Sequence, residues 1–203
     1  VQSYKMNLHE DSSYTTGRRG VAATVIVEKI VGSLAETGGS LKECKILGDK
    51  VNRNSGSMGV AFSSCTVPAA GKPTFKLGPD EMEFGVGIHG EPGRRRDKVQ
   101  PAQEITNELL GAIIEDLKLE NNGEILLFVN GMGGTPLTEL YLLYDNAKKT
   151  LDNKNIKIAR SLVGNYCTSL EMQGASLTIT KLDQELKKHW DSPVHTAAMR
   201  WGL

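Results

Sequence analysis

The apolar segments that end in glycine are the sequence feature that most restricts the folds this chain can adopt. The segment 124–130 is almost wholly apolar and leads into the glycine-rich turn 131–135. Glycine makes up 22 of the 203 residues, which is about 11% against a typical 7%. Glycines at the ends of apolar runs permit the tight turns between strands and helices that α/β proteins use. We therefore expect an α/β fold with a mixed or largely parallel sheet flanked by helices.

Hydrophobic spacing and turn residues divide the chain into helices and strands. Ser40 and Glu43 have the spacing of a capping box at the start of the second helix. The segments 68–79 and 90–101, rich in proline and glycine or in charge, are expected to be loops. The predicted helices are 18–34, 40–54, 101–119, 136–151 and 184–190, and the predicted strands are 58–67, 82–89, 124–130, 156–163 and 175–181.

Charge and apolar content exclude several classes of function. Lys and Arg together number 24, as do Asp and Glu, so a basic face that binds nucleic acid is not expected. The longest apolar run, 21–27, has seven residues, whereas a membrane-spanning helix needs roughly 20. The N-terminal sequence lacks the apolar core of a signal peptide. These features predict a cytoplasmic protein that contacts neither nucleic acid directly nor a membrane.

The cysteines and histidines give no sign of a disulfide or a metal site. Cys44, Cys65 and Cys167 lie far apart with no CxxC spacing, so we expect free thiols in a reducing compartment. His189 and His195, like the other histidines, do not have the spacing of metal ligands. No metal site is predicted.

The segment 81–93 is the first candidate site. It places His89 at the end of a predicted strand, with glycines at 85, 87, 90 and 93 around it. Ligands of α/β proteins gather outside the carboxyl ends of strands, and a neutral imidazole is nucleophilic near pH 7. Either Glu83 or Glu91 can orient such a ring. The alternative is a histidine that only completes a tight turn.

The segment 129–136 is the second candidate, because a strand leads there through a glycine turn to a helix N-terminus. This layout can cradle a phosphate with backbone N–H groups, although the Walker and Rossmann spacings are absent. The alternative is a turn that only packs. The run Arg94, Arg95 and Arg96 is interpreted either as a contact for a phosphate or acidic partner, or as solvated loop surface.

Six sequence segments stand in an order that is found together in one family. They are YTTGRRG (14–20), SSCTVPAAGKPTF (63–75), EMEFGVGIHGEPG (81–93), VNGMGGTPLTELY (129–141), NYCTSLEMQGASLT (165–178) and WDSPVHTAAMRWG (190–202). GIHGEPG and NGMGGTPL are the most specific of these motifs. On them, from about Ser12 to the last residue, the chain resembles the substrate-binding (K) subunit of dihydroxyacetone kinase.

The resemblance implies a covalent mode of substrate binding. His89 matches the family's histidine, whose imidazole nitrogen adds to the ketone carbon of dihydroxyacetone to give a hemiaminal. It implies no cofactor in this chain, because ADP or ATP with magnesium belongs to a separate L subunit or a fused L domain. We favour the bacterial two-subunit type, in which the ADP is recharged from phosphoenolpyruvate through the sugar phosphotransferase system. A homodimer is also expected from the resemblance.

Two departures from the family pattern shape the expected domains and function. The family's N-terminal glycine-rich segment and acidic general base have no counterpart here, and the acidic pair usual before YTTGRRG is replaced by the stretch 5–10. We therefore expect residues 1–56 to be the helical end of a preceding domain, and 57–203 a C-terminal α/β domain that carries His89. Alone, this chain is expected to have little or no kinase activity. The alternatives are an inactive paralogue that acts as a dihydroxyacetone-sensing transcriptional co-activator, and a structural or dimerisation domain.

Overall fold

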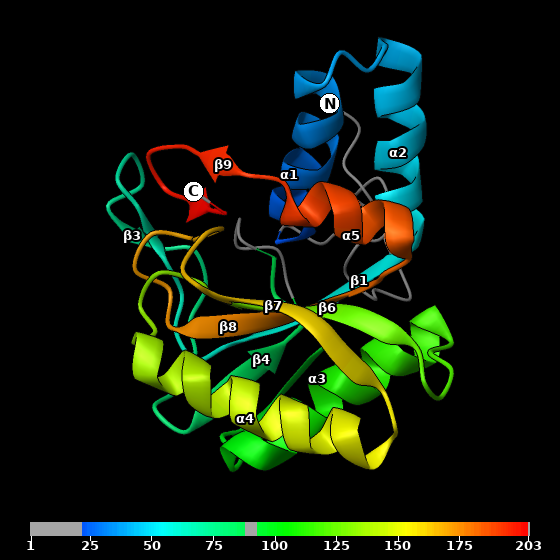
Figure 1. Cartoon of the computed structure of the whole chain (residues 1–203). Coiled ribbons are helices and arrows are strands. Elements are labelled where there is room, and N and C mark those ends of the chain that lie inside the picture. The colour runs from blue at the N-terminus through cyan, green and yellow to red at the C-terminus, as the bar shows by residue number, and fades with distance from the viewer. Residues whose placement is uncertain (1–21, 88–92, 203) are drawn as a thin grey trace.

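A computed structural model describes residues 22–87 and 93–202 of the chain. A six-stranded sheet lies between two layers of helices (Figure 1). The helices are α1 (Ala23–Glu36), α2 (Leu41–Arg53), α3 (Ala102–Leu117), α4 (Leu137–Asn153) and α5 (Gln184–Asp191). The sheet strands are β1 (Ser55–Ala61), β4 (Glu81–Phe84), β5 (Arg95–Lys98), β6 (Glu124–Gly131), β7 (Lys157–Gly164) and β8 (Gly174–Lys181). Two short hairpins pair β2 (Thr66–Val67) with β3 (Lys72–Pro73) and β9 (Val194–His195) with β10 (Arg200–Trp201).

The sheet is mixed, with the strand order β5-β4-β1-β8-β6-β7. Neighbouring strands are antiparallel except β6 and β7, which are parallel and are connected through α4. A parallel pair needs a crossover of a dozen or more residues, and α4 with its flanking turns supplies it. Asn130 near the end of β6 pairs in register with Gly164 at the end of β7. The loops that follow both strands therefore start at the same end of the sheet.

Strand β6 is buried on both faces because helices cover both sides of the sheet. Helices α3 and α4 lie on one side, and α1, α2 and α5 lie on the other (Figure 1). Leu127 belongs to the core that includes Leu109 of α3. Its neighbour Phe128 points the opposite way, into a core with Ile30 of α1 and Trp190 of α5. This double burial explains why the β6 sequence is a continuous apolar run.

The predicted helices agree well with the structure where it describes them. Helix α2 begins after Ser40, whose side chain accepts a hydrogen bond from the Glu43 N–H while the Glu43 carboxylate accepts one from the Ser40 N–H. The capping box is thus confirmed. The first predicted helix is α1, and residues 18–21 of its expected range lie outside the described residues.

The strand and loop predictions need four corrections. The strand predicted over 58–67 starts earlier and ends at Ala61, where its pairing with β8 stops. The strand predicted over 82–89 ends at Phe84, because Gly85 turns the backbone with a φ of 78°. The loop predicted over 68–79 contains β3, and the loop predicted over 90–101 contains β5, which pairs with β4.

The expected division of the chain at residues 56 and 57 remains a prediction. In the structure α2 leads into β1, which begins at Ser55, and α1 shares a core with β6 through Ile26 and Leu126. Among the described residues there is no helix of the length and apolar character that a bilayer crossing needs.

Candidate functional site

Segments far apart in the sequence meet in one buried cluster. Val86 from the first candidate segment packs in the same cluster as Met132 from the glycine turn and Met172 from the β7–β8 loop. Ala61 and Cys65 complete the buried part of this cluster. It lies beside the carboxyl end of β6, the end of the sheet where α/β proteins collect ligands. The structure therefore brings together the two segments that the sequence singled out.

Glu83 joins the two sides of the segment that carries His89. The residue is only 8% exposed. Its Oε1 accepts a hydrogen bond from the Gly93 N–H at 2.7 Å, and its Oε2 accepts one from Arg96 Nη2 at 3.0 Å. The two carboxylate oxygens of Glu83, on β4, thus bind β5 through Arg96 and the residues just before β5 through Gly93. His89 and Glu91 lie outside the described residues, so the orientation of the ring by either glutamate remains a prediction.

Gly85 and Gly93 allow the backbone on the two sides of this segment to come close. Gly85 has a φ of 78° and donates its N–H to the Gly59 carbonyl at 2.7 Å. A Cβ on Gly93 would lie 2.2 Å from the carbonyl oxygen of Phe84, a distance no side-chain carbon can adopt. Glycine is therefore required at both positions for the close approach of the flanking residues.

The glycine turn after β6 uses its backbone donors within the protein. The Met132 N–H bonds the Gly174 carbonyl at 3.1 Å, and the Gly134 N–H bonds the Met172 carbonyl at 2.9 Å. The Gly133 N–H bonds Asn165 Oδ1 at 3.2 Å. These three N–H groups are not available to a phosphate, so the geometry favours the packing interpretation of the turn over the phosphate cradle.

Two polar side chains that the sequence analysis did not single out hold the end of the sheet together. Asn130 is 1% exposed; its Nδ2 donates to the Cys167 carbonyl at 2.8 Å, and its Oδ1 accepts from the N–H groups of Tyr166 and Cys167. Thr135 Oγ1 donates to the Gly174 carbonyl and accepts from the Gly174 N–H. The sequence signal that could have identified them is the polar residue on each side of the glycine turn, Asn130 before it and Thr135 after it.

Two residues of the arginine run, Arg95 and Arg96, lie on the edge strand β5, and Arg94 comes directly before it. Arg95 Nη2 donates to Glu108 Oε2 at 2.9 Å, and its guanidinium lies 5.1 Å from the centre of the Phe84 ring. The hydrogen bond to Glu108 raises the pKa of Arg95. Arg96 pairs with Glu83 on the neighbouring strand. Arg95 and Arg96 therefore pair within the fold on a strand, so the loop prediction is wrong for these two residues, although both side chains stay about half exposed to solvent.

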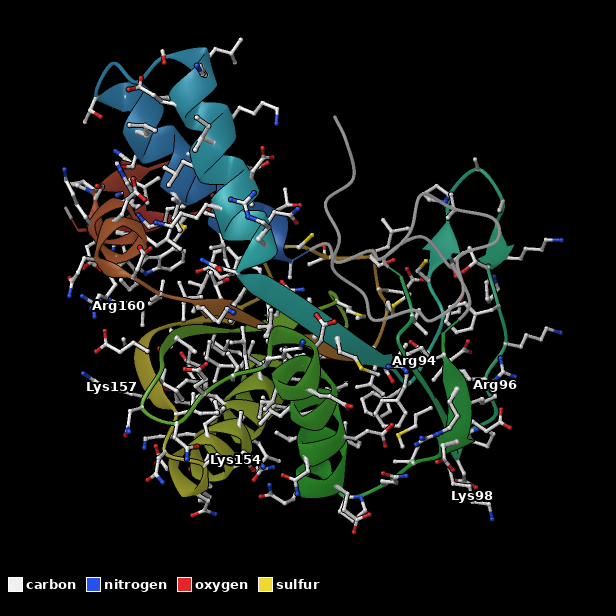
Figure 2. The ribbon with its side chains drawn as sticks, turned by 90° about the vertical axis from the view of Figure 1, so that its right-hand side faces the viewer. Arg94, Arg96, Lys98, Lys154, Lys157 and Arg160 are labelled. Carbon is white, nitrogen blue, oxygen red and sulfur yellow. The ribbon has the colours of Figure 1, made fainter. Side chains whose placement is uncertain are left out.

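The cations labelled in Figure 2 form two groups at opposite edges of the sheet. Arg94, Arg96 and Lys98 lie at or beside β5 on one edge. Lys157 and Arg160 lie on β7 at the other edge. The six labelled cations are thus divided between the two edges of the sheet.

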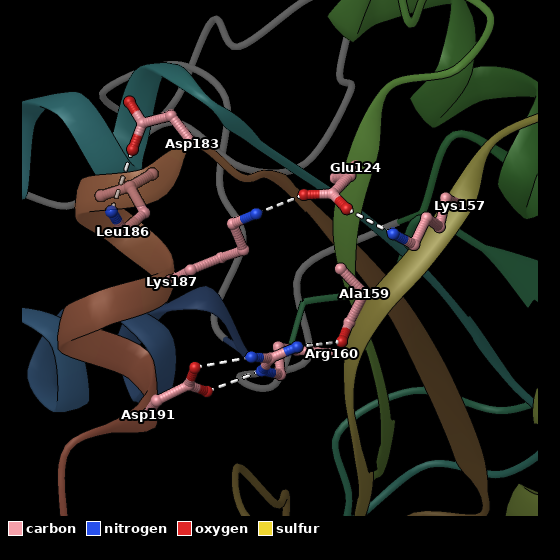
Figure 3. Close-up of polar contacts among 8 residues, drawn as sticks. All are labelled: Glu124, Lys157, Ala159, Arg160, Asp183, Leu186, Lys187 and Asp191. Atoms are coloured by element: carbon pink, nitrogen blue, oxygen red, sulfur yellow. Dashed lines mark hydrogen bonds and ion pairs between the residues drawn. The ribbon is translucent and has the colours of Figure 1, made fainter.

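A network of ion pairs connects β6, β7 and α5 (Figure 3). Glu124 bonds Lys157 Nζ at 2.6 Å and also pairs with Lys187, and these hydrogen bonds lower its pKa to about 2. Arg160 binds both carboxylate oxygens of Asp191, each at 2.6 Å. A cavity of about 360 Å³ lies between these groups. Because these charges are paired across the three elements, the network holds α5 against the sheet.

The thiols and acidic groups build no metal centre in the described residues. Within residues 22–87 and 93–202, no three His, Cys, Asp or Glu side chains lie close enough together to hold a metal ion. The cysteines are free thiols, with Cys65 buried and Cys44 and Cys167 partly buried. Burial is the main cause of the raised pKa of the Cys167 thiol.

Comparison with known proteins identifies a family and several relatives. The family model described as the Dak1 domain matches residues 7–198. The chain is 50% identical over 176 residues to the dihydroxyacetone-binding subunit of a PTS-dependent dihydroxyacetone kinase from Listeria innocua, covering 87% of this chain and 54% of that protein. It is 42% identical over 217 residues to the corresponding subunit of the PEP-dependent kinase of Escherichia coli strain K12, covering 95% and 61%. The chain thus spans little more than half of these relatives.

Solved structures support the same grouping. A dihydroxyacetone kinase operon co-activator is 33% identical with a TM-score of 0.82, over 89% of this chain and 56% of that one. The dihydroxyacetone kinase of C. freundii in complex with AMP-PNP and Mg²⁺ is 28% identical with a TM-score of 0.76, over 92% of this chain and 34% of that one. The α/β fold with a mixed sheet is therefore shared with these proteins, and the expected fold class is confirmed.

Proposed function

This chain belongs to the Dak1 family, and from that premise we propose that it is the dihydroxyacetone-binding part of a dihydroxyacetone kinase. The observation that carries the proposal is the meeting of Val86, Met132 and Met172 in one cluster. Val86 precedes His89 by three residues, so its packing beside the carboxyl end of β6 supports a substrate site at this end of the sheet. The identity to named dihydroxyacetone-binding subunits supports the choice of substrate.

In the proposed mechanism His89 binds the substrate covalently. An unprotonated imidazole nitrogen adds to the C2 carbonyl carbon of dihydroxyacetone, the C=O π bond becomes an O–H bond, and the proton that the ring loses balances the one that the oxygen gains. The product is a hemiaminal with a tetrahedral carbon. The terminal hydroxyl is then held for attack on a phosphoryl group, which is a positioning effect. The transfer gives dihydroxyacetone phosphate.

Covalent binding explains how such a site selects its substrate. Glycerol carries the same hydroxyls but no carbonyl, so it cannot form the adduct. Discrimination by hydroxyl contacts alone would be weaker, because both molecules present them.

The phosphoryl donor in this proposal belongs to a partner. We propose an L subunit or domain that carries ADP or ATP with magnesium. The internally bonded N–H groups of Met132, Gly133 and Gly134 agree with a nucleotide held elsewhere. The general base comes from the part of the family's subunit that this sequence does not match, so the chain alone is proposed to be inactive as a kinase. A cytoplasmic homodimer completes the proposal.

A second candidate function is a dihydroxyacetone sensor that co-activates transcription. The structural similarity to a dihydroxyacetone kinase operon co-activator supports it. The two candidates differ in catalysis, because only a kinase turns over substrate with an L subunit. Phosphorylation of dihydroxyacetone by the full-length protein with an L subunit and its phosphoryl donor distinguishes them: product formation identifies the kinase, and binding without product identifies the sensor.

Ligand-dependent stabilisation tests the proposed substrate. Because a ligand that binds the folded state raises its stability, dihydroxyacetone is expected to raise the Tm of the 203-residue chain, whereas glycerol at the same concentration is not. The His89→Ala variant is expected to lose the shift. Equal shifts with both compounds, or a shift retained in the variant, would contradict covalent capture by His89.

A further inference from the structure

Glu83 is a buried acidic residue between two buried apolar neighbours on β4, Met82 and Phe84. A carboxylate loses hydration when it is buried, and the loss is tolerated where hydrogen-bond donors compensate for it. Glu83 has two such donors, the Arg96 guanidinium and the Gly93 N–H. Arg96 is a cross-strand neighbour, because it pairs in register with Glu83. The bond to Gly93 needs a separate explanation, since Gly93 lies outside both strands.

The hydrogen bond to Gly93 fastens the β4–β5 hairpin beyond its last pair of strand residues. Phe84 pairs with Arg95 at the end of the two strands, and the Arg94 N–H bonds the Phe84 carbonyl at 2.7 Å. One residue further from β5, the Gly93 N–H bonds the Glu83 side chain, also at 2.7 Å. The carboxylate thus takes the place that a backbone carbonyl of the neighbouring strand holds within a sheet.

Gly93 is a position at which the packing requires a flexible residue. A side chain is excluded there, because a Cβ would lie 2.2 Å from the carbonyl oxygen of Phe84 and 2.7 Å from Cγ of Glu83. Glycine, however, loses more conformational freedom on ordering than any other residue. The Glu83 carboxylate compensates for this cost, since its hydrogen bond holds the Gly93 backbone in one conformation.

The other side of the hairpin connection is held by packing. Val86 is buried in the cluster that contains Met132 and Met172. Only residues 87–92 lie between Val86 and Gly93, and His89 is one of them. The conformational freedom of the segment that carries His89 is therefore limited at one end by the core and at the other end by Glu83.

We propose that Glu83 is a positioning residue for substrate capture, which acts on His89 through the backbone of Gly93. This inference rests on the proposed function and adds the residue that restrains the capturing segment. Without the restraint, the segment samples conformations in which His89 cannot add to the carbonyl carbon, so the binding-competent fraction falls. The apparent dissociation constant rises in inverse proportion to that fraction, whereas the adduct, once formed, breaks down at the same rate.

Glu83→Met tests the restraint, because methionine has a similar length, suits a buried position and accepts neither hydrogen bond. The apparent dissociation constant for dihydroxyacetone, measured from the adduct fraction by carbon NMR, is expected to rise roughly three- to tenfold, the range expected for the loss of one hydrogen bond. The rate of adduct formation should fall by the same factor. Arg96→Gln is the matched control, since it also breaks the ion pair with Glu83 but keeps the carboxylate that holds Gly93. This control should leave the dissociation constant unchanged.

Two checks separate positioning from a loss of folding. The binding measurements are made at a temperature where circular dichroism shows every variant to be folded, and amide exchange of Gly93 is followed without substrate. Exchange is expected to be faster in Glu83→Met and unchanged in Arg96→Gln. If Glu83→Met does not fold, Glu83→Gln replaces it. It should cause a smaller change in the same direction, because a neutral amide oxygen accepts a weaker hydrogen bond than a carboxylate.

The possible results distinguish this inference from the function on which it rests. If the unmodified chain forms the adduct, an unchanged dissociation constant in the folded Glu83 variant, or an equal rise in Arg96→Gln, would overturn the positioning role and leave the proposed function standing. A faster breakdown of the adduct, with an unchanged rate of formation, would mean that Glu83 contacts the adduct itself, and would also overturn the role. If the unmodified chain forms no adduct, the proposed function fails and the positioning role fails with it, whatever the exchange rate of Gly93.

Discussion

Replacing Gly133 by alanine is expected to destabilise the chain strongly, whereas the same change at Gly111 is expected to stabilise it. Gly133 has a φ of 117°, and a Cβ there would lie 1.9 Å from the carbonyl oxygen of Leu170. The backbone strain costs about 1–3 kcal/mol, and relief of the overlap costs about 1–3 kcal/mol more. The sum predicts that the free energy of unfolding falls by about 4 kcal/mol, which corresponds to roughly 8–16 °C in Tm for a domain of this size.

Gly111 provides the matched control because it lies in the middle of α3, where an added Cβ would meet nothing within 4 Å. Alanine in a helix is favoured over glycine by about 0.5–1 kcal/mol, so Gly111→Ala should raise the stability by that amount. Urea unfolding followed by circular dichroism measures both changes through the midpoint and slope. The reasoning would be refuted if Gly133→Ala changed the stability by less than about 1 kcal/mol, well below the strain and overlap costs combined.

Two further predictions concern charged groups. Glu83→Gln is expected to lower the free energy of unfolding by about 1–2 kcal/mol, because a charged hydrogen bond to a half-exposed arginine is lost. A double-mutant cycle with Arg96→Gln should show coupling between the two residues. Additive effects of the two substitutions would contradict the pairing. Glu124 has a pKa of about 2 in the folded chain against an ordinary 4.5, owing to Lys157 and Lys187. Since the folded pKa is the lower one, its stabilising contribution is complete above about pH 4.5 and is lost as the pH falls toward 2. Glu124→Gln should flatten the acid dependence of urea unfolding in that window, and an unchanged slope would refute this.

Local sequence signals were sufficient to predict the helices and strand β6. Ser40 and Glu43 are neighbours in the chain, so their capping box needs no tertiary information. The apolar run of β6 is recognisable because helices cover both of its faces. In each case the residues that form the element also provide the signal for it.

Strand β5 was not predicted, because local sequence signals do not reveal it. Its sequence of arginines, aspartate and lysine is typical of a solvated loop, and it becomes a strand because β4 supplies partners. Arg95 lies over Phe84 and Arg96 pairs with Glu83, contacts that depend on the register of the two strands. Such register is a long-range property that a single sequence does not reveal.

The candidate site was predictable in its segments but not in its assembly. The glycines near His89 and in the turn 131–135 marked both segments as unusual. Their meeting through Val86 and Met132 depends on the antiparallel insertion of β1 and β8 between β4 and β6. The sequence did not indicate that order of strands, so the contact could not be foreseen.

Carbon NMR of carbonyl-labelled dihydroxyacetone mixed with the chain tests the central claim most directly. The account predicts that the ketone signal of the bound fraction is replaced by that of a tetrahedral carbon, and that His89→Ala abolishes the change. An unchanged ketone signal, or a tetrahedral signal that persists in the His89→Ala variant, would contradict capture of dihydroxyacetone by His89.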